Sequence, residues 1–245
     1  MMKLRENRAK QKLKKGEVVT AMAGNNSPDM IDFLGQIGFD TMWIEGEHGP
    51  VDFGDIPNLT RACDVWGMTS LVRINLNIPG VIYRTFDLGA QGIAVPHINT
   101  AEEAYKVVDA AKFAPIGTRG NATGRQGYGV KDYFAKANDE TMIVVLIEDI
   151  IAIDNLDEIL TVDHIDAFYV APGDLAQTMG YIGQPNHPEV LETIDGAIEK
   201  IVTSGRTAGA LVNTDTVDDY IRKGARFFFM SWHSWATTGA QIYLD

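Results

Sequence analysis

Two carboxylates that end neighbouring apolar runs in the second half of the chain predict a metal site. Glu148 follows the run 144–147, and Asp174 follows the run 168–171 after a Pro-Gly pair. If both runs are adjacent parallel strands, the two carboxylates project toward the same end of the sheet. Anionic oxygens placed so close repel one another unless a cation joins them, and oxygen ligands suit Mg²⁺ or Mn²⁺. The alternative is that each carboxylate caps the following helix or pairs with Arg73.

Arg73 and His48 end two earlier apolar runs and add groups suited to enolate and proton-transfer chemistry. A guanidinium in a cavity mouth binds a carboxylate through paired hydrogen bonds or stabilises an enolate oxygen, although Arg73 could simply neutralise its acidic neighbours. His48 follows two acids in Glu45-Gly46-Glu47-His48, so a carboxylate can fix one imidazole tautomer while the other nitrogen transfers protons. His97, at a similar position without an acidic neighbour, is interpreted as structural.

Two glycine-containing segments are candidates for binding small anions. In Pro172-Gly173-Asp174, the glycine admits a ligand close to the backbone, and the helix start directs free amides toward a carboxylate. The segment 113–120 contains Arg119 between small residues, and this weaker pattern favours a structural or interfacial arginine. Lone Cys63 excludes an intrachain disulfide and fits a reducing compartment, and no catalytic role is expected for it.

Short β-branched runs alternate with helical patterns, and this order predicts a single (β/α)₈ barrel that positions those groups at one mouth. A doubly wound sheet is less favoured, because the turn 23–26 lacks the spacing of a dinucleotide-binding loop. Thr100 and Glu103 form an expected capping box. The irregular stretch 114–130 is too long for an ordinary connection and is expected to be a functional loop. The eight expected strands cover residues 18–22, 41–45, 69–73, 92–96, 143–148, 167–171, 208–212 and 227–231.

Composition agrees with one soluble domain over residues 1–245. The chain has 245 residues, 45% hydrophobic and 22% charged, and a formal net charge of -12. That charge disfavours nucleic acid and anionic membranes as partners. No apolar stretch approaches the roughly 20 residues of a membrane span, and no secretory signal is visible, so a cytoplasmic location is expected. The basic run 1–15 is interpreted as a solvated leader helix.

Taken in order, these motifs resemble the HpcH/HpaI aldolase family over residues 16–232. The resemblance implies a barrel of the phosphoenolpyruvate/pyruvate type, usually assembled as a hexamer, a trimer of dimers that swap their last helix. It further implies a metal-dependent class II aldolase that cleaves 4-hydroxy-2-oxo acids to pyruvate and an aldehyde. The motifs are Glu45-Gly46-Glu47-His48-Gly49-Pro50, Val72-Arg73, Gly89-Ala90 through Val95-Pro96, Pro115-Ile116-Gly117-Thr118-Arg119-Gly120, Ile147-Glu148 and Ala171-Pro172-Gly173-Asp174-Leu175-Ala176.

Site roles follow from the resemblance residue by residue. Glu148 and Asp174 match ligands of a divalent metal ion, Mg²⁺, Mn²⁺ or Co²⁺. Arg73 matches the arginine on the pyruvate oxygen, and the Gly173 and Asp174 amides match contacts to the pyruvate carboxylate. His48, with Glu45 as its acidic partner, matches the proton-transfer pair. Asp87 matches an acid offered to the neighbouring subunit. No strand end offers an obvious Schiff-base lysine.

Three positions depart from the family pattern. Glu45 stands where aspartate is frequent, and Leu146 stands where well-known members have glutamine. Trp232-His233-Ser234-Trp235 replaces small and acidic residues, and the chain leaves little final helix for swapping. Leu146, Leu211 and Trp232 together predict a more apolar aldehyde pocket than a dicarboxylate substrate needs. Open alternatives are an acyl-CoA lyase of the citrate-lyase or malyl-CoA type, with Arg119 and Arg125 as its thin candidate cofactor site, an oxaloacetate decarboxylase, and a non-catalytic carboxylate-binding barrel.

Overall fold

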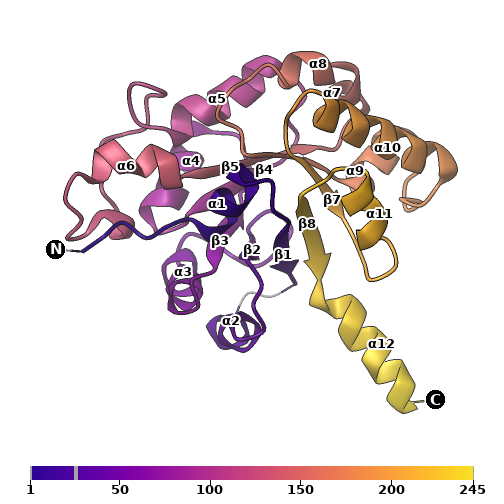
Figure 1. Cartoon of the computed structure of the whole chain (residues 1–245), viewed down its shortest axis with the longest axis horizontal. Coiled ribbons are helices and arrows are strands. Elements are labelled where there is room, and N and C mark those ends of the chain that lie inside the picture. The colour runs from indigo at the N-terminus through magenta and orange to yellow at the C-terminus, as the bar shows by residue number, and fades with distance from the viewer. Residues whose placement is uncertain (1, 25–26, 245) are drawn as a thin grey trace.

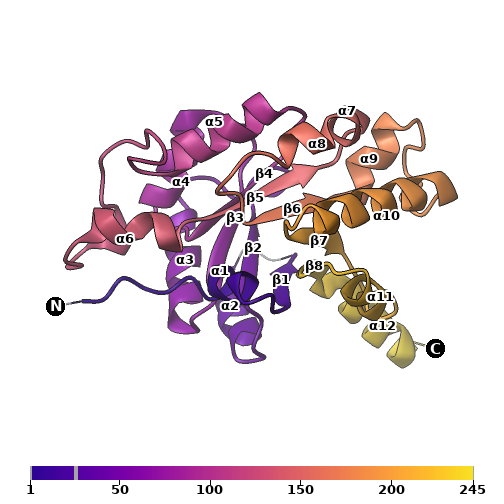
Figure 2. The same ribbon diagram turned by 45° about the horizontal axis from the view of Figure 1, so that its top comes forward.

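Eight parallel strands close into a barrel in the order of the sequence (Figures 1 and 2). The computed structural model describes residues 2–24 and 27–244. The predicted (β/α)₈ fold is therefore confirmed, and no strand end differs from its expected position by more than one residue. The strands are β1 Val19–Ala23, β2 Thr41–Glu45, β3 Thr69–Arg73, β4 Gly92–Val95, β5 Met142–Ile147, β6 Ala167–Val170, β7 Ala208–Leu211 and β8 Phe227–Ser231.

Helices surround the barrel, and local sequence signals start several of them. Proline occupies the first turn of α2, α3, α4, α9 and α10, where a missing amide hydrogen costs nothing. The predicted capping box of Thr100 and Glu103 is present at the start of α5. The helices are α1 Arg8–Lys14, α2 Pro28–Gly35, α3 Ile56–Val65, α4 Pro79–Asp87, α5 Ala101–Ala111, α6 Tyr133–Glu140, α7 Ile150–Asp154, α8 Leu156–Ile159, α9 Pro172–Thr178, α10 Pro188–Thr203, α11 Val217–Arg222 and α12 Trp232–Leu244.

Alternation along each strand separates two apolar cores. On β5, Val144 and Leu146 belong to the cluster inside the barrel, whereas Val145 and Ile147 face the surrounding helices. Aromatic rings fill much of the interior, and the Trp43 and Phe229 ring centroids lie 4.8 Å apart. Because side chains alternate with a period of two, the polar residues that follow the inward positions point into the mouth above this cluster.

Helix α1 closes the N-terminal end of the barrel, so the expectation of a solvated leader is wrong. Ala9 and Leu13 pack into the interior cluster. Lys10 is 6% exposed, and its Nζ donates to Asp166 Oδ1 at 2.6 Å and to the Thr141 carbonyl at 2.9 Å. Lys12 likewise pairs with Asp40 just before β2, whereas Lys14 and Lys15 at the end of the segment are exposed.

The long stretch 114–130 connects α5 to α6 and does not line the mouth of its own barrel. Arg125 donates to Thr60 Oγ1 at 2.9 Å, and Gln126 Nε2 donates to the Gly89 carbonyl at 2.6 Å. Gly89 lies between the end of α4 and the start of β4, which is the closed end. The structure places this stretch at the closed end of its own barrel, and a function for it stays a prediction.

The last helix, α12, is 13 residues long and projects away from the barrel (Figures 1 and 2). The expectation that little final helix remains is therefore wrong. Ile242, Tyr243 and Leu244 are 77%, 94% and 84% exposed. None of the helices that the structure describes is long and apolar enough to span a membrane.

Candidate active site

Three predicted site residues meet at the C-terminal mouth because each continues an inward-facing strand position. Glu45 follows Trp43 on β2, Arg73 follows Leu71 on β3, and Glu148 follows Leu146 at the end of β5. The register of β2 and β3 pairs Glu45 directly with Arg73. The barrel thus brings together residues far apart in the sequence, as predicted.

Glu45 fixes Arg73 and the backbone that follows β2. Its oxygens accept from Arg73 Nε at 2.9 and 2.8 Å, and Oε1 also accepts the amides of Glu47 at 2.9 Å and His48 at 3.0 Å. Burial opposes ionisation, but Arg73 and these amides outweigh it and lower the pKa of Glu45. Glu45 therefore contacts the His48 backbone and not its imidazole, contrary to the expected pairing.

Glu47 is the other acid before His48, and sequence reasoning assigned it no role of its own. Its side chain is 9% exposed, and Oε2 lies 3.0 Å from Arg73 Nη1 and 3.8 Å from His48 Nε2. Oε1 lies 3.6 Å from His97 Nε2. Burial raises the pKa of Glu47, while Arg73 and the histidines oppose the shift. Glu47, not Glu45, is the carboxylate nearest the His48 ring, and the even spacing from Trp43 and Glu45 was the available signal.

Glu148 is buried and has one oxygen without a protein partner. It is 1% exposed, and Oε1 accepts the His97 amide at 2.8 Å, whereas Oε2 is buried without a hydrogen bond. Burial raises the pKa of Glu148 to about 7, the His97 amide and ring oppose the shift, and the charges of Asp174 and Glu47 add to it. An orphaned buried carboxylate oxygen beside a second acid fits a divalent cation.

Asp174 and Gly173 lie in the first turn of α9, beyond β6. Ala171, at the N-cap, offers no side-chain cap to the amides of this turn. Gly173 is exposed, with no atom within 4 Å of the position that a Cβ would take. In the described part of the chain, no group of three histidine, cysteine, aspartate or glutamate residues is placed to hold a metal. A cation on Glu148 and Asp174 would therefore keep positions for water or substrate oxygens.

Of the three apolar candidates for the aldehyde pocket, Leu146 is fully buried inside the barrel, so only Leu211 and Trp232 lie where the strands end. Leu211 ends β7, is 42% exposed and lines a cavity of about 250 Å³ together with Pro172, Asn186 and Ser231. Trp232 instead donates from Nε1 to the Gly24 carbonyl at 2.7 Å. The structure thus shows Trp232 holding the first βα loop, whereas Leu211 faces open space.

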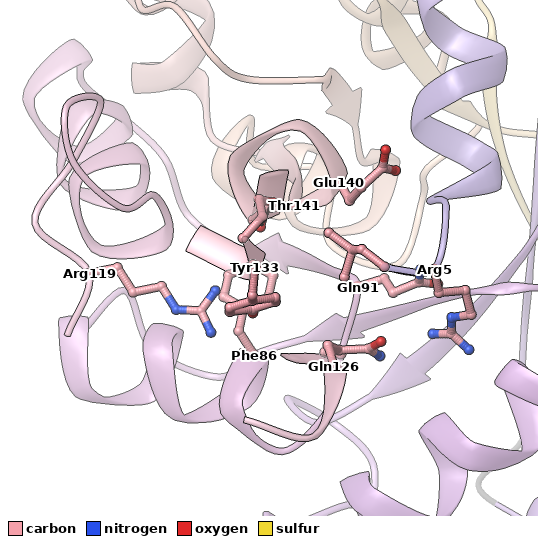
Figure 3. Close-up of a pocket in the computed structure, with 11 residues that line it drawn as sticks. Arg5, Phe86, Gln91, Arg119, Gln126, Tyr133, Glu140 and Thr141 are labelled. Atoms are coloured by element: carbon pink, nitrogen blue, oxygen red, sulfur yellow. Dashed lines mark hydrogen bonds between the residues drawn. The ribbon is translucent and has the colours of Figure 1, made fainter. Parts of the chain in front are cut away.

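Asp87 ends α4 and is not brought to the mouth of its own barrel. Its Oδ1 accepts from Arg119 Nη2 at 2.7 Å, and the Arg119 guanidinium lies 4.9 Å from the Phe86 ring centroid and 4.5 Å from that of Phe113. Figure 3 shows Arg119 beside Phe86 and Tyr133 at a small pocket. That pocket, about 20 Å³, has room for about one water and not for a substrate.

Fold and site together define a barrel enzyme with an arginine and paired carboxylates at its mouth, and comparison with known proteins gives the family. The model of the HpcH/HpaI aldolase/citrate lyase family matches residues 21–235. The chain belongs to this family, as the sequence motifs predicted.

Relatives support the same assignment. The chain is 35% identical over 205 residues to a 2-dehydro-3,6-dideoxy-6-sulfogluconate aldolase of Pseudomonas putida, covering 82% of this chain and 80% of the relative. It is 36% identical over 227 residues to a hydroxypyruvate/pyruvate aldolase of Roseovarius nubinhibens, covering 90% and 88%. An HpcH/HpaI aldolase structure from Desulfitobacterium hafniense DCB-2 superposes with a TM-score of 0.87 at 26% identity, covering 96% of both chains. The prediction of a carbon–carbon lyase of the aldolase type is thereby confirmed.

Proposed function

We propose that residues 1–245 act as a single-domain, cytoplasmic class II pyruvate aldolase that cleaves a 4-hydroxy-2-oxo acid to pyruvate and an aldehyde. The observation that carries the proposal is the unpartnered, buried Oε2 of Glu148 in the same mouth as Arg73. Curated relatives named as aldolases agree with it. The working unit is a homo-oligomer, a hexamer built as a trimer of dimers, in which Asp87 serves a neighbouring site.

Each residue of the mouth has a distinct part in the proposed reaction. Glu148 and Asp174 would hold a divalent ion, Mg²⁺, Mn²⁺ or Co²⁺, which would supply Lewis-acid chemistry at the 2-oxo group. Arg73, oriented by Glu45 and Glu47, donates to the oxygen that becomes negative when the C3–C4 bond breaks. The amides of Gly173 and Asp174 bind the pyruvate carboxylate.

His48 handles the proton in this scheme. In cleavage it removes the C4 hydroxyl proton, the C3–C4 electron pair moves onto the enolate, the aldehyde leaves, and C3 of the enolate then takes up a proton from solvent to give pyruvate. In condensation it returns that proton. Its ring is 65% exposed at the mouth and lies 3.8 Å from Glu47 Oε2, so Glu47 is the group that can orient it.

The acyl-CoA alternative loses its support in the structure. Arg119 pairs with Asp87, and Arg125 pairs with Asp64. Both arginines lie at the N-terminal ends of the strands, at the opposite end of the barrel from Arg73 and Glu148. Neither is therefore free at the mouth of its own barrel to bind a pyrophosphate.

The proposed aldehyde is uncharged. Leu211 is partly exposed at the end of β7, and the described residues that line the cavity beside it carry hydroxyl, amide and apolar groups and no charged side chain. A second carboxylate on the acceptor would find no cation there. We therefore expect neutral hydroxyaldehydes to be turned over faster than succinic semialdehyde, and the opposite preference in a matched steady-state comparison would refute this part of the proposal.

Exchange of pyruvate methyl protons in D₂O tests the enolate step without knowledge of the aldehyde. By NMR, the wild-type enzyme should exchange these protons with Mg²⁺ or Mn²⁺ and stop when EDTA is added. Arg73→Ala should lower the exchange rate at least a hundredfold, since it removes a charge-assisted donor from the oxyanion.

Arg222→Ala is the matched control, because Arg222 lies exposed on α11 in an ion pair with Asp219. It should exchange at the wild-type rate. Absence of exchange in the wild type under every divalent metal, with tight pyruvate binding, would instead identify a non-catalytic carboxylate-binding barrel.

A further inference from the structure

His97 at the exit of β4 adopts an unusual backbone conformation that none of the proposed catalytic roles explains. Its φ is 53°, in the left-handed region, which it shares among the described non-glycine residues with Asp132 and His164. A non-glycine side chain in this region is strained and persists where surrounding contacts require it. The contacts of His97 show what that conformation achieves.

Both the backbone and the ring of His97 face acidic oxygens. Its amide donates to Glu148 Oε1 at 2.8 Å, and ring Nδ1 lies 3.5 Å from the same oxygen. On the other side of the ring, Nε2 lies 3.6 Å from Glu47 Oε1. The ring is 55% exposed, so the two carboxylates, and not burial in an apolar pocket, define its place.

These contacts give the two oxygens of Glu148 different surroundings. Oε1 is engaged by His97, while Oε2 is buried and has no hydrogen bond. A carboxylate held in this way offers a cation one oxygen. Glu47 also links His97 to Arg73. Its Oε1 faces the His97 ring, and its Oε2 lies 3.0 Å from Arg73 Nη1.

We propose that His97 is a positioning residue that holds Glu148 for monodentate binding of the divalent cation and sets the spacing between that cation and Arg73. The inference rests on the proposed function and deepens it. Outer groups that orient metal ligands contribute about 10–100-fold to metal affinity or activity. His97 acts through Glu148 and Glu47 and touches no reacting atom.

Metal affinity tests this role independently of turnover. Binding of Mn²⁺ alone is measured by the electron paramagnetic resonance signal of the free ion. His97→Gly accepts the positive φ and keeps the amide but removes the ring, and it should weaken Mn²⁺ binding at least tenfold. It should also raise the KM for pyruvate in methyl exchange, because Glu47 and Arg73 lose their lateral support.

His164→Gly is the matched control. His164 also has a positive φ, 67°, but it precedes β6 and is remote from the mouth. Mn²⁺ affinity and pyruvate KM should keep their wild-type values in this variant. His97→Asn, which tolerates the conformation and offers an amide donor to Glu148, should recover part of the lost Mn²⁺ affinity, and it serves in place of His97→Gly if that variant does not fold.

The outcomes separate this inference from the proposed function. Wild-type Mn²⁺ affinity in His97→Gly, within twofold, would overturn the positioning role while leaving the aldolase proposal intact. Wild-type protein that neither binds Mn²⁺ nor exchanges pyruvate protons would overturn the proposed function itself. A selective loss in His97→Gly, partial recovery in His97→Asn and no change in His164→Gly are the expected results.

Discussion

At the scale of single residues, carboxylates with different partners share one mouth. Glu45 accepts from Arg73 and from two backbone amides, so its negative charge is matched by donors. Glu148 has a single amide on one oxygen and nothing on the other. The difference follows from position: Glu45 has Arg73 beside it in register, whereas Glu148 follows an all-apolar strand. The first acid is suited to orienting a cationic side chain, and the second is suited to binding a cation.

A residue at the closed end gives a prediction on pH. Lys112 is 1% exposed, and its Nζ donates to the carbonyls of Asn138 at 2.8 Å and Thr141 at 2.7 Å. Burial, with the nearby charge of Lys10, lowers the pKa of Lys112 from 10.5 to about 7. Two acceptors satisfy a neutral amine, whereas an ammonium brings a third hydrogen and a buried charge.

The sign of the effect follows from proton binding. Between pH 7 and 10.5 the unfolded chain keeps the proton that folded Lys112 has lost, so the free energy of unfolding should rise with pH in this window. The slope approaches about 1.4 kcal/mol per pH unit. Lys112→Met should remove this slope in urea titrations at several pH values, and an unchanged slope would contradict the assignment. Lys136→Met, on α6, is the comparison.

At the scale of elements, the strands were predictable because each is a short β-branched or apolar run bounded by turn residues. Alternation then fixed which residue of each run faces inward, and so Glu45, Arg73 and Glu148 could be placed together from the sequence. The even spacing from Trp43 was a signal for Glu47, but the His97 contacts could not be predicted, because they depend on the path of the chain after β4 ends. His97 itself has a left-handed backbone conformation, which is usually signalled in the sequence by a glycine and is not signalled here.

Helix α1 shows why a basic segment can be misread. Its basic residues lie close together in the sequence, but their acidic partners, Asp40 and Asp166, are far apart along the chain and converge only in the closed barrel. A charge count along the sequence therefore indicates a solvated face. The burial of Ala9 and Leu13 could be inferred only from the barrel itself, because its N-terminal end exposes apolar side chains that α1 covers.

The packing of α1 against the barrel interior leads to a prediction about stability. Leu13 is 9% exposed within the interior cluster, so Leu13→Ala should lower the free energy of unfolding by about 2–3 kcal/mol. Pyruvate methyl exchange should be unaffected at temperatures where the variant is folded, because Arg73 and Glu148 lie at the other end. Lys14→Ala, one position along and exposed, should change stability by less than about 0.5 kcal/mol. Loss of exchange in folded Leu13→Ala would refute the separation of the two ends.

At the scale of the whole molecule, α12 leaves the barrel and carries a strip of exposed apolar side chains. Exposed apolar side chains of this extent are unusual unless another surface covers them. Its nearest anchor is Trp235, whose ring centroid lies 5.9 Å from that of Phe39. The proposed homo-oligomer gives this helix a partner, a second copy of the chain.

A pair of substitutions in the last turn tests that partner. Ile242 is 77% exposed, and Ile242→Asp should lower the mass measured by light scattering after size exclusion, because a buried charge disfavours the interface. Gln241→Asp adds the same charge one residue earlier on the same helix and should keep the wild-type mass. Equal masses for all three proteins would exclude this turn from the assembly.

Some contacts at the closed end of the barrel can form only late in protein synthesis. Lys10 can bond to Asp166 only after 156 further residues have been synthesised, and Asn7 can bond to Glu140 only after 133 further residues. At about 5–20 residues per second, a ribosome needs roughly 8 to 30 seconds to deliver those partners. Some partners of α1, such as Asp40, are synthesised early, but the base of the barrel is sealed only after more than half of the chain has emerged. A fused domain ahead of Met2 that folds quickly would confine α1 during that interval, so the yield of active protein should depend on the length of the linker between them.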